Sequence, residues 1–132
     1  MNYLIIILII AVAGCRKEQD RSIVLNESFT LKKGETACTP NDEVCIDFVN
    51  VSGDSRCPSN VMCIWQGVAE VNLVLKYNQT DYPFTLNTID HLQYKKDTVL
   101  QGYTIQLEQL NPYPDGRPIN SRDYVVQLKV RK

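Results

Sequence analysis

The chain has 132 residues, of which 14 are Lys or Arg and 15 are Asp or Glu, and its formal net charge is −1. Charges that nearly cancel, with no basic cluster before the last few residues, exclude the electrostatic footprint of a nucleic-acid-binding protein. The length suffices for one domain with one modest hydrophobic core, and we expect no second domain.

Residues 4–13 form an uninterrupted apolar run. About ten apolar residues are too few to cross a bilayer as a helix, which needs roughly twenty. Their number matches the hydrophobic region of an export signal, although the preceding Met1-Asn2-Tyr3 lacks the basic residue that such signals normally carry. We therefore interpret residues 1–14 as a signal peptide.

The apolar run ends in Val12-Ala13-Gly14-Cys15, which resembles the lipobox of bacterial lipoproteins. The resemblance implies that Cys15 becomes the first residue of the mature chain and carries lipid through a thioether. More than one acyl chain gives stable anchoring, where a single chain is marginal. An ordinary secretory signal and a short membrane anchor are the alternatives.

Residues 15–21 are charged, lack apolar periodicity and are expected to form a solvated tether between the membrane and the domain of residues 22–132. In lipoproteins, residues just after the lipidated cysteine help to sort the protein between membranes. Arg16 is not the aspartate associated with inner-membrane retention. The resemblance therefore favours the outer membrane and leaves its face open.

Apolar and polar residues alternate along several stretches, as a strand with one buried face requires. We expect strands within residues 23–31, 44–49, 68–77, 84–86, 103–108 and 124–131, of which 68–77 is the clearest and central. Turn residues lie between them at 33–35, 50–54, 78–81 and 111–118. Residues 89–99 have no readable pattern and are expected to form a long loop or an irregular edge.

No stretch has helical periodicity long enough for a core helix. The chain is therefore predicted to be all-β, as an antiparallel β-sandwich of the immunoglobulin-like kind or a barrel of about six to eight short strands.

Besides Cys15, the chain has Cys38, Cys45, Cys57 and Cys63. An even number of cysteines in an exported chain predicts disulfides, and four cysteines allow three pairings. We favour Cys38–Cys45 and Cys57–Cys63, because each pair encloses a short segment with turn residues. A zinc site of four thiolates is the alternative, but the paired spacing of such sites is missing. We expect no metal and no cofactor.

Residues 54–69 read DSRCPSNVMCIWQGVA. This segment resembles the D-S-R-C-P-x-x-V-x-C-x-W-x-G-x-A pattern of small uncharacterised bacterial exported proteins, many of them lipoproteins. Asn111-Pro112-Tyr113-Pro114 and the strand after Asp123 resemble their P-Y-P and D-Y-x-V ending, so that the similarity covers most of the chain from Gly34 onward. It implies an all-β exported domain and no particular activity, and Cys38 and Cys45 lie outside the pattern.

A Cys57–Cys63 disulfide would clamp a loop made of Pro58, Ser59, Asn60, Val61 and Met62. Pro restricts the backbone, and Ser and Asn favour a turn. One interpretation is a preorganised loop that binds a partner, because preorganisation lowers the ordering cost of binding; a protease-inhibitor loop would be a special case.

The other interpretation of this loop is purely structural. The disulfide would then brace the start of the strand at residues 68–77. Trp65, which has the parity of the buried face, would lie in the core, and Asp54 would pair with Arg56 or cap the turn.

Catalytic candidates are few. His91 is the only histidine and lies beside Asp90, and there is no nucleophile elbow of the G-x-S-x-G type. The acids Asp42, Glu43 and Asp115 are better explained as turn residues than as general acid and base or as calcium ligands.

We therefore expect a non-enzymatic, lipid-anchored protein of the cell envelope that binds an envelope partner. An inhibitor of an exported protease or other hydrolase, acting through the Cys57–Cys63 loop, is the second hypothesis. An enzyme that uses His91 and neighbouring acids is the third.

Overall fold

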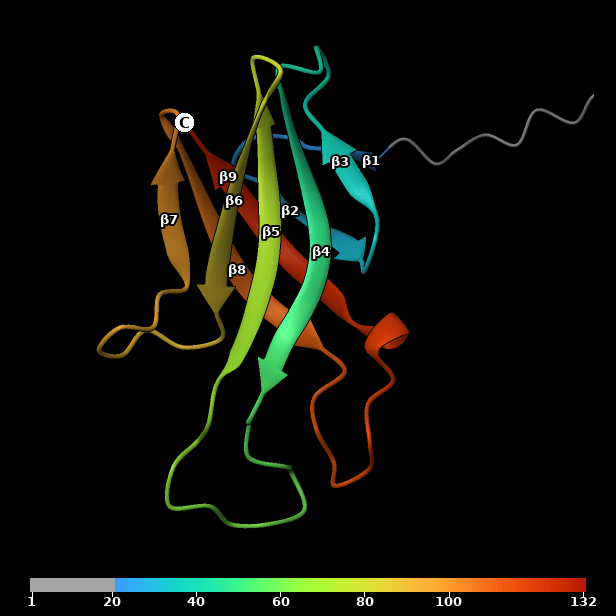
Figure 1. The fold of residues 1–132 in the computed structure, drawn as a ribbon, viewed down its shortest axis with the longest axis vertical. Helices are drawn as coiled ribbons and strands as arrows, with labels where there is room; N and C mark the ends of the chain where they lie inside the picture. The colour runs from blue at the N-terminus through green and yellow to red at the C-terminus, as the bar shows by residue number, and fades with distance from the viewer. Residues whose placement is uncertain (1–20) are drawn as a thin grey trace, which may run out of the picture.

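The structure, a computed structural model, describes residues 21–132. The expected signal peptide, Cys15 and the tether up to residue 20 lie outside this range. Two β-sheets enclose one hydrophobic core and form an all-β sandwich (Figure 1). Within residues 21–132, no helix combines the length and the apolar character needed to cross a membrane.

One sheet has the strand order β1-β3-β4-β5-β6 and the other has the order β2-β9-β8-β7. The strands are β1 Arg21–Ser22, β2 Ser28–Lys32, β3 Thr36–Cys38, β4 Val44–Asp54, β5 Ala69–Tyr77, β6 Thr80–Asn87, β7 Asp97–Leu100, β8 Tyr103–Asn111 and β9 Val125–Arg131. A short 3-10 helix, η1 Ser121–Asp123, precedes β9. Only β1 and β3 pair in parallel, and every other neighbouring pair is antiparallel.

The core consists of every second side chain of the long strands. The predicted alternation at 44–49, 68–77, 103–108 and 124–131 is confirmed, because buried and less buried residues alternate along β4, β5, β8 and β9. Fully buried side chains such as Phe48 contribute about 1.5–3 kcal/mol each by leaving water. These strands therefore supply most of the packing that holds the sheets together.

The turn expected at residues 50–54 is wrong, because β4 continues through it to Asp54. The pairing with β5 shifts register between Phe48 and Asn50 and again between Val51 and Gly53. Such bulges insert an extra residue and bend the strand, and they tolerate residues that are otherwise typical of turns. The bulged half of β4 carries Asp54 to the far end of the sandwich.

Short elements also differ from the sequence prediction. Of the stretch expected as one strand at 23–31, only residues 28–31 lie in a strand, β2, because the chain turns at residues 25–26, where Asn26 has a φ of 68°. Part of the unreadable segment 89–99 forms the edge strand β7. β6 is longer than expected and includes Pro83, which an edge strand tolerates because its missing N–H is not needed for pairing.

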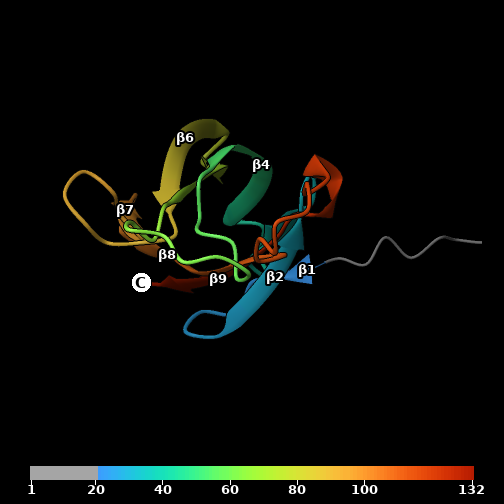
Figure 2. The same cartoon turned by 90° about the horizontal axis from the view of Figure 1, so that it is seen from below.

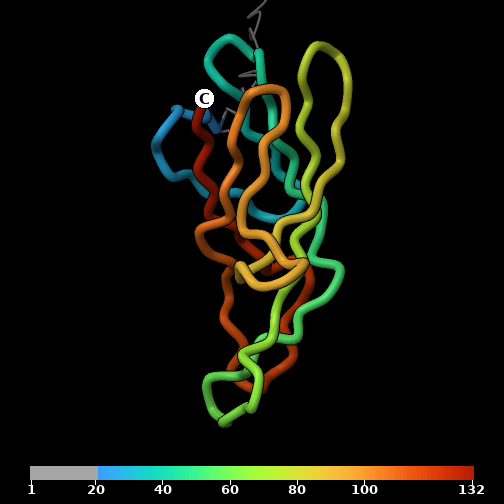
Figure 3. The backbone as a smooth tube through the Cα atoms, turned by 90° about the vertical axis from the view of Figure 1, so that its left-hand side faces the viewer, coloured from blue at the N-terminus to red at the C-terminus, as the bar shows by residue number. Residues whose placement is uncertain are grey.

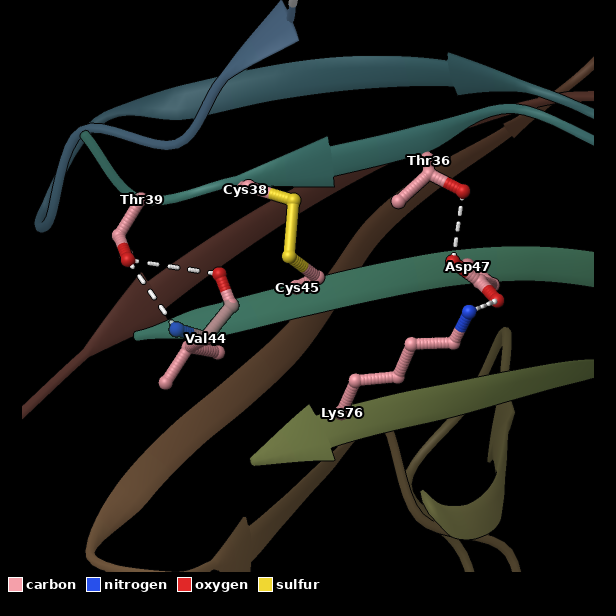
Figure 4. Close-up of a disulfide and its surroundings, with 7 residues drawn as sticks. All are labelled: Thr36, Cys38, Thr39, Val44, Cys45, Asp47 and Lys76. Carbon is pink, nitrogen blue, oxygen red and sulfur yellow. Dashed lines mark hydrogen bonds and ion pairs between the residues drawn. A yellow bond between two sulfur atoms is a disulfide. The ribbon is translucent and has the colours of Figure 1, made fainter. Parts of the chain in front are cut away.

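The three-residue strand β3 was not predicted, and its attachment to β4 is shown in Figure 4. Cys38 lies directly opposite Cys45 in the pairing, and the two form a disulfide. Thr36 donates a hydrogen bond to Asp47 at 2.6 Å, and Lys76 of β5 pairs with the same carboxylate at 3.0 Å. Cross-links of this kind hold a strand that is too short to stay in place by ladder hydrogen bonds alone.

The two ends of the sandwich are formed by different segments of the chain. Arg21 pairs with Ala37, and Ala37 pairs with Ile46 near the start of β4, so the chain enters the described domain at that end. The connection of residues 55–68 projects from the opposite end, beside the connection between β8 and β9 (Figure 1, Figure 2 and Figure 3). We call this second end the loop end.

Candidate functional site

The loop end is built from two connections that are far apart in the sequence. Cys57 and Cys63 form a disulfide, as expected, and close a ring in the first connection. Tyr113 of the second connection donates its hydroxyl to the carbonyl of Cys57 at 2.9 Å, and Ser59 N donates to Pro114 O at 2.9 Å. We call residues 57–65 the clamped loop.

A hydrogen-bonded stem carries the clamped loop. Ser55 N and Ser55 Oγ both donate to Val68 O at 2.9 Å, and Cys57 N donates to Gln66 O at 2.8 Å. Gly67 has a φ of +72°, and a Cβ at this position would lie 1.8 Å from the carbonyl oxygen of Ser55. The stem therefore requires glycine here and continues the β4–β5 pairing almost to the disulfide.

Arg56 is 8 % exposed and joins the stem to the second connection. Its Nε and Nη2 donate to the two carboxylate oxygens of Asp54, at 2.8 and 2.7 Å. Its Nη1 donates to Leu110 O at 2.7 Å, and Nη2 also donates to Pro112 O at 2.9 Å. Tyr124 donates its hydroxyl to Asp54 at 2.9 Å. The expected pairing of Asp54 with Arg56 is thus present, within a network we call the Arg56 network.

Asp54 and Tyr124 of the Arg56 network each keep one protonation state near neutral pH. Burial disfavours the carboxylate form of Asp54, but the hydrogen bonds from Arg56 and Tyr124 and the charge of Arg56 outweigh it and lower the pKa of Asp54. Burial, together with the hydrogen bond to Asp54 and its charge, raises the pKa of Tyr124 to about 12. Asp54 is therefore ionised and Tyr124 is neutral, as their hydrogen bond requires.

An open hollow of about 390 Å³ lies beside this network. Its charged lining residues are Asp54, Arg56 and Arg117, and each is engaged in an ion pair, Arg117 with Asp115. Every charged side chain that lines this hollow is thus already paired within the protein. We therefore place the candidate site on the clamped loop.

Apolar side chains are exposed along the clamped loop. Val61 is 52 %, Met62 102 %, Ile64 110 % and Trp65 46 % exposed. Contiguous apolar patches on a soluble domain mark interaction surfaces more often than chance, and Met and Trp are enriched in protein interfaces. These four exposed side chains make the clamped loop the candidate binding surface of the described residues.

The expectation that Trp65 lies in the core is wrong. β5 begins only at Ala69, and the left-handed backbone at Gly67 breaks the alternation that would have carried the parity of the strand back to Trp65. The indole instead lies against the ring of His91, with 5.5 Å between the ring centroids. The sequence contained a sign of this, since Trp65 is separated from the strand by a glycine.

Within the described chain, the backbone N–H and C=O groups of residues 62–65 make no hydrogen bond with other backbone groups. Their neighbours on both sides are paired, Val61 with Pro58 and Gln66 with Cys57. The clamped loop thus exposes unpaired backbone together with its apolar side chains.

The catalytic candidates all lie outside the named strands. His91 is exposed and pairs through its backbone with Tyr94, and Asp90 accepts a hydrogen bond from the backbone of Lys96. Asp42 lies in the β3–β4 turn at the other end. Its carboxylate is near the sulfurs of Cys38 and Cys45, but these are bonded to each other and offer no thiolate to a metal.

The Arg56→Ala variant should lower the free energy of unfolding by about 3–5 kcal/mol, because it leaves the carboxylate of Asp54 buried without its partner. Urea denaturation measures this change. Arg117→Ala is the matched control: Arg117 also pairs with an aspartate, but in an exposed position where ion pairs contribute little. Equal small effects of the two substitutions would contradict the role given to Arg56.

The contribution of Asp54 to stability should depend on pH. A carboxyl whose pKa is lowered by folding stabilises the protein above its unfolded pKa of about 3.9 and loses this contribution as the pH falls through the folded pKa. The difference in urea midpoint between wild type and Asp54→Asn should be largest near neutral pH and narrow below about pH 4. A difference that stays constant through the acid range would refute this.

Comparisons of the chain with known protein families, with curated proteins and with solved structures found no match. The resemblance of residues 54–69 to small exported bacterial proteins and that of residues 12–15 to a lipobox stay predictions.

Proposed function

We propose that this protein is a lipid-anchored binding module of the bacterial cell envelope, attached through Cys15 to the outer membrane. It binds a partner protein through the clamped loop. The observation that carries the proposal is the exposure of Met62 and Ile64, at 102 % and 110 %, on a loop that the disulfide and the stem hold in place.

A rigid loop explains why such exposure can serve binding. A loop backbone that is already ordered loses little conformational entropy when a partner covers its apolar side chains, so more of the burial free energy remains as affinity. The Cys57–Cys63 disulfide, the hydrogen bonds of Cys57 and the Arg56 network all restrict the loop before a partner arrives.

The position of the clamped loop fits an anchor at Cys15. Arg21 lies in register with Ile46, and β4 runs from there to Asp54, a distance of about 25 Å at the rise of a strand. A tether at Arg21 and a clamped loop beyond Asp54 place anchorage and binding at opposite ends. The clamped loop would face away from the membrane that holds the lipid.

The proposal is tested in intact cells with a photo-crosslinking residue at position 62. We expect a protein adduct from position 62 and none from position 41, which is exposed at the opposite end. Ile64→Asp should abolish the adduct, because a charge replaces one of the two most exposed apolar contacts.

The anchor is tested in the same cells. Cys15→Ala should abolish fatty-acid labelling and membrane retention, while the purified domain remains folded, because Cys15 lies outside the described domain. Unchanged labelling would refute lipidation.

The crosslinking experiment has its own contradicting outcome. Adducts of equal yield from positions 41 and 62, or none from position 62, would refute the binding function of the clamped loop.

A further inference from the structure

The two disulfides of residues 21–132 lie in different surroundings. We call Cys38–Cys45 the strand disulfide and Cys57–Cys63 the loop disulfide. Both cysteines of the strand disulfide are half-buried, whereas in the loop disulfide Cys57 is half-buried and Cys63 is exposed. Exposed disulfides are in general the more labile ones, and structural ones resist reduction by thiols. Exposure alone therefore favours the loop disulfide as the one that a thiol opens.

The fold keeps the sulfurs of the strand disulfide together even when their bond is open. Cys38 and Cys45 lie directly opposite each other in the pairing of β3 with β4. Thr36 donates a hydrogen bond to Asp47 at 2.6 Å (Figure 4), and β3 also pairs with β1 on its other side. Two thiols that the fold holds side by side have a high effective concentration, so their disulfide re-forms readily.

The clamped loop gives Cys63 much less support. Within the described residues, the backbone groups of 62–65 make no hydrogen bond with other backbone groups, and the chain bends at residues 64–65. Met62 and Ile64, on either side of Cys63, are fully exposed. When the loop disulfide opens, the contact of Trp65 with His91 still restrains this stretch, but no backbone pairing does. Cys63 then moves away from its partner, and the effective concentration of its thiol falls.

Cys57 keeps its place whether the loop disulfide is closed or open. Its N–H donates to Gln66 O at 2.8 Å, and its carbonyl accepts the hydroxyl of Tyr113 at 2.9 Å. The bond from Cys57 to Gln66 closes the stem at the base of the loop, so opening the disulfide releases the loop and leaves the stem paired. A local element with an ordered and a released state is what a thiol–disulfide switch acts on.

We propose that the loop disulfide is a thiol-exchange site, that a dithiol protein of the cell envelope reduces it, and that this reduction releases the clamped loop and ends its binding. The loss of binding rests on the proposed function, since it takes the clamped loop to be the binding surface. The exchange itself does not depend on that function.

The reaction is a two-electron exchange in two steps. A thiolate of the dithiol attacks Sγ of Cys63, the exposed sulfur of the pair, forms a mixed disulfide with it and expels Cys57 as a thiolate. The second thiol of the dithiol then attacks its own sulfur in the mixed disulfide and releases Cys63. The loop disulfide is thereby reduced to two thiols, the dithiol is oxidised to a disulfide, and the two cysteines take up the two protons that the dithiol gives up.

The exchange is tested on the full-length chain carrying Cys15→Ala, because a free thiol at position 15 would itself exchange. The chain is equilibrated with mixtures of reduced and oxidised dithiothreitol, its free thiols are alkylated, and peptide mass spectrometry locates them. We expect half-reduction of the loop disulfide at a ratio of reduced to oxidised dithiothreitol at least about ten-fold lower than that for the strand disulfide.

Two variants test the cause of this difference, and each is the control for the other. Trp65→Ala removes the contact with His91 and should lower the ratio for the loop disulfide only. Thr36→Val removes the hydrogen bond to Asp47 but keeps a side chain that strands favour, and it should lower the ratio for the strand disulfide only.

The loss of binding is measured by the photo-crosslink from position 62 in intact cells. A double Cys57→Ala and Cys63→Ala variant lacks the loop disulfide permanently. It should give at least about ten-fold less adduct than wild type, because the loop is no longer ordered before a partner arrives. Ser59→Ala is the matched control, since it changes an exposed residue inside the same ring and keeps the disulfide; its yield should equal that of wild type.

Reduction of both disulfides at the same ratio, or of the strand disulfide first, would overturn the exchange site. An undiminished adduct from the double variant would overturn the release of the loop as the end of binding. If position 62 gives no adduct in the wild type while the loop disulfide is still reduced first, the proposed function fails and the exchange site stands.

Discussion

The Arg56 guanidinium is the contact on which the loop end depends. One planar group with five N–H donors binds the carboxylate of Asp54 in a forked pair and also reaches carbonyl oxygens of Leu110 and Pro112. The ammonium of a lysine has no planar fork and could not make these bonds in the same directions. Arg56 thus joins the end of β4, the end of β8 and the connection after β8, with Tyr124 attached through Asp54.

The sandwich and the loop end have separate roles. Alternating side chains of both sheets meet in one core, and this burial stabilises the domain without help from the clamped loop. The clamped loop can therefore keep apolar groups such as Met62 in water and leave its own backbone unpaired. Its order comes from Cys57, which is held by the disulfide, by the stem and by the hydroxyl of Tyr113.

Long strands could be predicted from the sequence because each has one face in the core, and the period of two is then visible over five or more residues. β3 and β7 have three and four residues, too few to show a period. Residues 50–54 were misread because a bulged strand and a turn use the same residue types. The disulfide pairing was predictable from spacing, since each pair encloses a short segment.

Only part of the candidate site could be predicted in this way. The loop from Pro58 to Met62 follows from the spacing of the two cysteines, but the exposure of Trp65 depends on the positive φ of Gly67. The partners that hold the loop, such as Tyr113 for Cys57, lie 56 residues away in the chain. A contact of this kind leaves no local pattern, so the contacts that hold the loop end become visible only in the fold.

The order of the clamped loop is the central claim, because an ordered apolar loop loses less conformational entropy than a mobile one when a partner covers it. Backbone ¹⁵N relaxation of the folded domain tests it most directly. Order parameters near about 0.85 for residues 62–65, close to those of the strands, are the result we predict. Values below about 0.6 would mean that the loop moves freely on the fast timescale and would contradict the account.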